Sequence, residues 1–158
     1  MGTLPQLLEE DIQRLDDELR ELLEQSDAST ALVIDKGGFL ITHQGDCRKF
    51  DLTTIAALAS GAYMANQTIA NLVHEPNFNS VYQQGEKYSM LVMSIDEECM
   101  LVVIFKAQVS VGVVKYYAGP ATRHIARQLV IAQERDPSNG IDLSILNLAD
   151  TSGVFRKK

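Results

Sequence analysis

The residue types that most often carry chemistry are few in this chain and lie far apart. The three histidines, His43, His74 and His124, fall on different predicted elements, and no HExxH-like spacing joins them. The two cysteines, Cys47 and Cys99, form no CxxC motif and cannot build a disulfide framework. We therefore expect no catalytic constellation, no metal site and no cofactor.

The glycines do not form a phosphate-binding loop either, because the pattern GxxxxGK[ST] is absent. The 158 residues, 46% hydrophobic and 22% charged, are typical of a globular domain. A net charge of −7 argues against binding to nucleic acid or to an anionic membrane. With no visible signal peptide and no apolar segment long enough to cross a bilayer, we expect a cytoplasmic protein that does not insert into membranes.

Hydrophobic periodicity predicts eight elements that must position any functional surface. The first helix has an apolar stripe at steps of four and three residues and a strongly acidic opposite face. Thr3 and Gln6 resemble a capping box at its start. The expected elements are a helix at Leu4–Ser26, strands at Thr30–Ile34 and Phe39–Thr42, a helix from Leu52 to about His74, strands at Ser80–Gln84, Tyr88–Met93 and Cys99–Phe105, and a helix from Val109 or Ser110 through Ala132.

The last part of the chain contains a buried strand, a helix with an internal proline and an apolar tail. Cys99–Phe105 is the most hydrophobic strand and is predicted to lie at the centre of the sheet. The apolar register of the last helix continues through Gly119 and Pro120, which favours one kinked helix over two. The segment Ile141–Phe155 is too apolar for an ordinary disordered tail. We expect it to dock on its own dimer or on a partner.

The second helix is unusually rich in alanine, glycine and serine. Gly61 in mid-helix costs about 1 kcal/mol relative to alanine, so close packing of another helix or backbone is the expected compensation. Its residues form two stripes at three- and four-residue steps. One stripe is predicted to cover the parent sheet, and the other to meet a second copy or a partner.

The order of elements and several local sequences resemble the roadblock/dynein light chain family. The first strand and its turn (Ala31–Gly38), the small-residue second helix (Leu58–Ala62) and the central strand (Leu101–Phe105) each look like the corresponding family segment. So does the opening of the last helix at Val111–Lys115. The long acidic first helix, the segment Gln84–Glu86 and the C-terminal extension make the chain most similar to bacterial MglB-type proteins. The resemblance covers about residues 4–135.

This resemblance implies an α/β (α+β) fold of the roadblock type, αββαβββα, with helices on the faces of a five-stranded antiparallel sheet. It also implies a homodimer in which sheets join edge to edge and second helices pack together. MglB-type dimers activate GTP hydrolysis by a small Ras-like GTPase of MglA type. They reshape the GTPase and insert no arginine finger, and Arg48, Arg123 and Arg127 have no sequence context that would mark one of them as a finger.

These implications assign residues to two surfaces. The GTPase-binding surface is expected on one strip of the second helix, and the dimer interface on another strip together with the strand Ser80–Gln84. The predicted partner-binding residues are Ala57, Ser60, Gly61, Met64, Gln67 and Thr68, and the predicted dimer-interface residues are Ala59, Ala62, Ile69, Val81 and Tyr82.

Two alternative functions come from other classes. A PAS- or profilin-like domain could enclose a small molecule between its helices and sheet, and a purely structural adaptor could dimerise and tether proteins. The small-residue second helix favours close helix contact over a ligand pocket, which more often has bulky aromatic walls. The expected organisation is a roadblock domain at residues 1–135 followed by a docking tail at residues 136–158.

Overall fold

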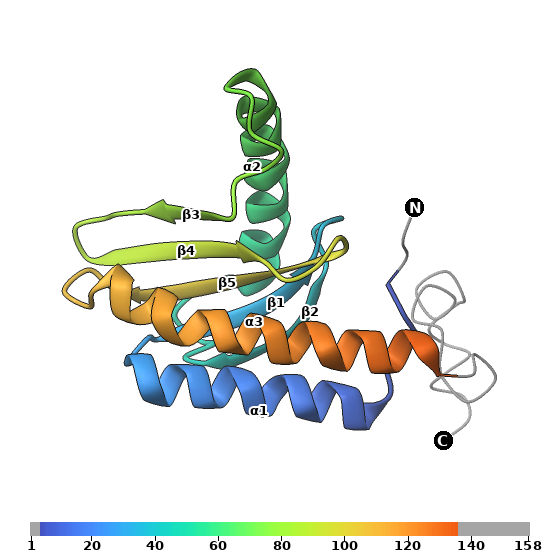
Figure 1. The fold of residues 1–158 in the computed structure, drawn as a ribbon. Helices are drawn as coiled ribbons and strands as arrows, with labels where there is room; N and C mark the ends of the chain where they lie inside the picture. Colours follow the sequence, from blue (N-terminus) through green and yellow to red (C-terminus); the bar gives the residue numbers. More distant parts are fainter. Residues whose placement is uncertain (1–3, 136–158) are drawn as a thin grey trace.

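The computed structural model describes residues 4–135, which form one sheet with helices on both faces (Figure 1). The predicted tail, residues 136–158, and Thr3 of the predicted capping box lie outside the described residues. The order of elements agrees with the prediction from the sequence. The elements are α1 (Glu9–Ser26), β1 (Thr30–Asp35), β2 (Leu40–Gly45), α2 (Leu52–Leu72), β3 (Ser80–Gln83), β4 (Tyr88–Ser94), β5 (Cys99–Lys106) and α3 (Val111–Glu134).

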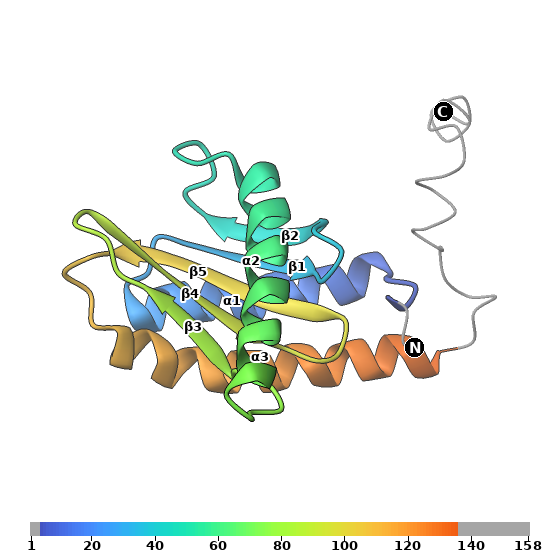
Figure 2. The same cartoon turned by 90° about the horizontal axis from the view of Figure 1, so that it is seen from above.

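The five strands form one antiparallel sheet in the order β2-β1-β5-β4-β3, and Figure 2 shows α2 crossing above it. β5 occupies the centre, and every residue from Cys99 to Phe105 is buried. The predicted position of this strand is thus confirmed. Because side chains of a strand alternate between its faces, an apolar β5 needs cover on both sides of the sheet.

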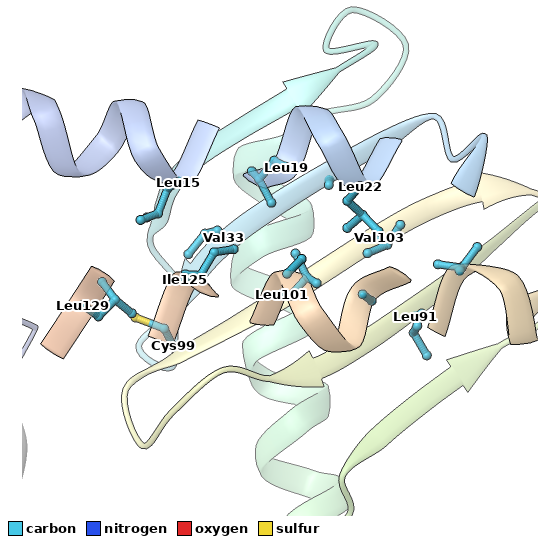
Figure 3. Packing of buried hydrophobic residues seen from close by; sticks show 14 of the residues in the cluster. Leu15, Leu19, Leu22, Val33, Leu91, Cys99, Leu101, Val103, Ile125 and Leu129 are labelled. Carbon is cyan, nitrogen blue, oxygen red and sulfur yellow. The ribbon is translucent and has the colours of Figure 1, made fainter. Parts of the chain in front are cut away.

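α1 and α3 lie side by side and cover one face of the sheet (Figure 1). Leu15, Leu19 and Leu22 of α1 point toward the strands and toward α3, as Figure 3 shows. All three are at most 1% exposed, and they pack with buried residues of β1, β5 and α3. Full burial of a leucine side chain contributes about 1.5–3 kcal/mol, so this leucine-rich layer is the main hydrophobic core.

The other face is covered by α2 alone. Its N-terminal half packs Leu52, Ala56, Ala59 and Tyr63 against the strands. Its C-terminal half rises away from the sheet, as Figure 1 shows. The cover on this face is therefore incomplete.

α1 begins at Glu9, five residues later than predicted. The Asp11 carboxylate accepts a hydrogen bond from the Leu8 backbone N–H (2.8 Å) and thereby caps the first turn. The same carboxylate pairs with Arg135 through two hydrogen bonds of 2.7 and 2.8 Å. Asp11 is fully buried, and Gln128 of α3 donates a further hydrogen bond to it at 2.7 Å. This contact joins the start of α1 to the end of α3, which lie 124 residues apart in sequence.

α3 is one continuous helix, as the unbroken apolar register predicts. Pro120 lies inside it and lacks the N–H that would bond to the carbonyl of Tyr116. The Thr122 hydroxyl donates a hydrogen bond to the Gly119 carbonyl at 2.7 Å, beside the interruption. None of the helices described within residues 4–135 is long and apolar enough to cross a membrane.

The buried Asp11–Arg135 pair predicts a specific loss of stability in acid. The hydrogen bonds from Arg135 lower the Asp11 pKa from 3.8 to about 2. Because the folded state holds this carboxyl ionised, its contribution of about 2 kcal/mol is present above pH 4 and falls as pH decreases toward 2. Asp11→Asn should lower the free energy of unfolding by about that amount at pH 6, and roughly half as much at pH 3.

Urea unfolding of both proteins at the two pH values measures this difference. Asp17→Asn is the matched control, since Asp17 is 63% exposed and pairs with Arg20 on its own helix. An exposed pair of this kind contributes little to stability. A difference between Asp11→Asn and the parent protein that does not change with pH would contradict the linkage.

Candidate functional site

The described residues bring no group of three or more metal-binding side chains together. His43 lies on β2, His74 directly follows α2 and His124 lies on α3, so the three histidines are on separate elements. Burial raises the pKa of the Cys99 thiol, which packs in the core beneath α3. The prominent exposed features are apolar side chains, and five of the large ones lie on α2 or at its C-cap: Leu58, Met64, Ile69, Leu72 and Val73.

The middle of α2 is fixed by Lys36 of the β1–β2 turn. The Ser60 hydroxyl donates a hydrogen bond to the Lys36 carbonyl, and the Lys36 ammonium lies 5.1 Å from the centre of the Tyr63 ring. That ammonium also donates to the Asp96 carbonyl (2.8 Å) in the β4–β5 turn. A cation over an aromatic face contributes about 0.5–1 kcal/mol or more. Lys36 thus connects α2 to two turns and sets the direction in which the helix leaves the sheet.

The predicted partner-binding residues separate into an exposed strip and one covered residue. Ala57, Gly61, Met64 and Thr68 are exposed, and their steps of four, three and four residues place them on one side of α2. Gln67 is half-buried. Ser60 is only 6% exposed because it faces the β1–β2 turn. We name the exposed residues Ala57, Gly61, Met64 and Thr68 the small-residue strip.

The predicted dimer residues separate in the same way. Ala62 and Ile69 are exposed, whereas Ala59 is 4% exposed and packs on its own sheet. Leu58 and Leu72, which the sequence analysis did not single out, lie on the same side as Ala62 and are 68% and 74% exposed. The sequence signal for both residues was their spacing, because Leu58 lies four residues before Ala62 and Leu72 lies three residues after Ile69. We name this side the apolar strip; it consists of Leu58, Ala62, Ala65, Ile69 and Leu72.

The two strips are neighbours on α2. Each residue of the apolar strip follows the small-residue strip by about one position, which corresponds to a rotation of about 100° around the helix. A Cβ added at Gly61 would meet no atom within 4 Å. The close packing that we expected at Gly61 is therefore not provided by its own chain.

β3, the strand that follows α2 in the chain, lies at one edge of the sheet. It pairs with β4, and within residues 4–135 no strand pairs with its other side. Val81 is half-buried, and Tyr82 is 40% exposed and stacks on Phe105 with ring centroids 6.2 Å apart. Unpaired N–H and C=O groups at such an edge can pair with another strand.

Comparisons with known proteins give this geometry a family context. The family model described as Roadblock/LC7 domain matches residues 14–105. A search of curated proteins found no significant match. Three solved structures are similar over most of their length: an MglB with tetrameric arrangement (28% identity, TM-score 0.78, 84% of this chain and 99% of that chain), the gliding protein MglB of Thermus thermophilus (29%, 0.77, 84% and 100%) and MglB of Myxococcus xanthus (25%, 0.76, 82% and 97%).

The open space at Gly61 predicts that Gly61→Ala stabilises the free protein. Alanine is the better helix former, and its methyl group meets no neighbour, so the free energy of unfolding should rise by about 1 kcal/mol in urea. Gly38→Ala is the matched control. Gly38 has φ +99°, and a Cβ there would lie 3.2 Å from the Ala57 Cα, so this change should destabilise. A destabilising Gly61→Ala would show that another copy already packs closely on this side.

Proposed function

The chain belongs to the Roadblock/LC7 domain family, and from this premise we propose that it is a homodimeric regulator of a small Ras-like GTPase of MglA type. It binds the GTPase and increases its rate of GTP hydrolysis. Similarity to MglB structures at 25–29% identity, over at least 97% of each of those chains, supports this function over that of a ligand sensor. Since its partner uses GTP, the proposed place of action is the cytoplasm.

The observation that carries the proposal is the exposed side of α2. A lone helix with Leu58, Ile69 and Leu72 at 47–74% exposure leaves apolar area in water that a second chain would cover. We assign the apolar strip and the free edge of β3 to the second copy, because the C-terminal half of α2 extends toward the β3 edge of the sheet in Figure 2. Paired α2 helices and joined β3 edges would then form one interface.

The small-residue strip is assigned to the GTPase. It faces about 100° away from the apolar strip, so one helix can contact both chains at once. Small side chains let a partner approach the backbone, and Met64, at 57% exposure, adapts its shape to the surface it meets. Anchoring of α2 by Lys36 presents this strip in a fixed orientation, which lowers the entropic cost of binding.

The arginines support activation without an arginine finger. Arg14, Arg20, Arg123 and Arg127 lie on α1 and α3, which cover the face of the sheet opposite to α2. Arg48, in the loop before α2, is the described arginine nearest in sequence to the proposed site. In the proposed mechanism the dimer therefore stabilises the arrangement in which the GTPase's own catalytic residues are aligned.

Met64→Arg should abolish GTPase binding while the dimer persists. The substitution puts a charged side chain into a small-residue contact, so the dissociation constant for the GTP-bound partner should rise at least about tenfold. Calorimetry with an MglA-type GTPase measures this, and light scattering should still give about twice 17.5 kDa. Val113→Arg, at an exposed apolar residue on α3, is the control and should bind normally. Loss of the dimer in Met64→Arg would instead assign this residue to the homodimer interface.

Arg48→Ala should leave the stimulated rate of GTP hydrolysis within about twofold of the parent value. An arginine finger contributes roughly 10³–10⁵ in kcat, so removing one would be unmistakable. Single-turnover hydrolysis by the GTPase, with and without each protein, makes the comparison. A loss of about a thousandfold would identify Arg48 as a finger, and binding without any stimulation by the parent protein would identify an adaptor.

A further inference from the structure

A groove runs between the C-terminal half of α1 and the N-terminal half of α3, on the face of the molecule opposite to α2. It has a volume of about 650 Å³. Tyr117 and Pro120 contribute apolar surface to it, and Glu21, Lys115 and Arg123 contribute charged surface. The His124 imidazole contacts the Glu18 carboxylate at 2.9 Å across the two helices. Tyr116 stands at its edge, 73% exposed, with its ring edge-on to that of Tyr117.

Further exposed apolar residues lie on the same side of α3, separated from this groove by the exposed Arg127. Val130 and Ile131 are 49% and 48% exposed, and they lie about one turn before Arg135, where the described chain ends. Tyr116 lies 19 residues before Arg135, which corresponds to about 28 Å along the helix. These residues and the groove together form a discontinuous apolar stripe, interrupted by basic side chains, from the end of α3 back to Tyr116.

We propose that the groove and this stripe bind the chain's own segment 141–155, folded back along α3. The segment carries seven large apolar residues: Ile141, Leu143, Ile145, Leu146, Leu148, Val154 and Phe155. The inference does not depend on the proposed GTPase function, because it concerns the opposite face of the sheet.

The length of the chain and the point where α3 ends both allow this binding. The Asp11–Arg135 pair fixes the point of departure beside the start of α1. Five residues lie between Arg135 and Ile141, so the six residue steps can span about 20 Å when extended, and Pro120 lies about 22 Å back along α3. Covalent attachment over this distance keeps the segment at millimolar effective concentration near the groove, which favours it over an unattached competitor.

The charges of the two surfaces also match. α1 exposes Asp17, Glu21 and Glu24 beside the groove, and the chain ends in the basic sequence Arg156–Lys158. α3 exposes Lys115, Arg123 and Arg127, whereas the apolar part of the segment carries Asp142 and Asp150. The acidic groups of the segment would thus lie along the basic helix, and its basic end along the acidic helix.

Paramagnetic relaxation measured by NMR on the full-length chain tests the proposal. A nitroxide is attached to Ser152→Cys in a Cys47→Ser background, where the buried Cys99 does not react. Amide signals of residues 115–124 of α3 and 18–25 of α1 should broaden strongly, while those of the C-terminal half of α2 should not. Uniform weak broadening of all elements would overturn the proposal.

Two variants and one mixed sample identify the occupant of the groove. Tyr116→Asp should abolish the broadening, whereas Phe39→Asp, at a 64%-exposed aromatic residue in the β1–β2 turn, should preserve it. Both side chains are largely in water, so neither change should unfold the protein, and unchanged dispersion of the amide spectrum verifies this.

A mixture of spin-labelled protein that contains no ¹⁵N with ¹⁵N protein that carries no spin label should give no broadening. Broadening in the mixture would show that the groove binds a segment of a second copy, which contradicts the proposal.

Discussion

The need to cover both faces of β5 determines the rest of the architecture. Every residue from Cys99 to Phe105 is buried, so water must be kept from both sides of the sheet centre. On one side α1 and α3 achieve this with leucine and isoleucine, and they are joined at one end by the buried Asp11–Arg135 pair. On the other side a single helix, α2, performs the same task with one leucine, two alanines and one tyrosine. The asymmetry leaves α2 as the element with exposed apolar area.

Much of the fold follows from the sequence because its signals are local. Leucines at steps of four and three residues specify α1, a continuous apolar run specifies β5, and an unbroken register carries α3 through Pro120. The start of α1 was misplaced because its determinant is not local. Asp11 caps the helix while bound to Arg135, at the end of α3, and no spacing in the sequence reveals that partner.

The division of α2 into strips could be predicted only in outline. Alanine, glycine and serine are almost equally at home on either side of a helix, so their pattern fixes the register weakly. Ala59 and Ser60 were therefore assigned to interfaces, although the first packs on the sheet and the second bonds to the Lys36 carbonyl. Leu58 and Leu72 carried the clearer signal, since large apolar residues on the side opposite to the sheet have no cover within the protomer. Lys36 could not be recognised, because its role depends on the meeting of two turns with α2.

The exposure of one side of α2 allows a helix-destabilising glycine to occupy the proposed binding site. Gly61 lowers helix stability by about 1 kcal/mol, and the open space around it shows that no contact in the protomer offsets this cost. On the sheet side of the same turn, Ser60 and Tyr63 contact Lys36 and anchor the middle of α2 where it meets the sheet. This anchor fixes the direction of the helix, and the glycine keeps its outer side flat. A side chain at position 61 would stabilise the free protein and, in the proposed complex, separate α2 from its partner. Stability of the free helix and closeness of the proposed contact thus oppose each other at one residue.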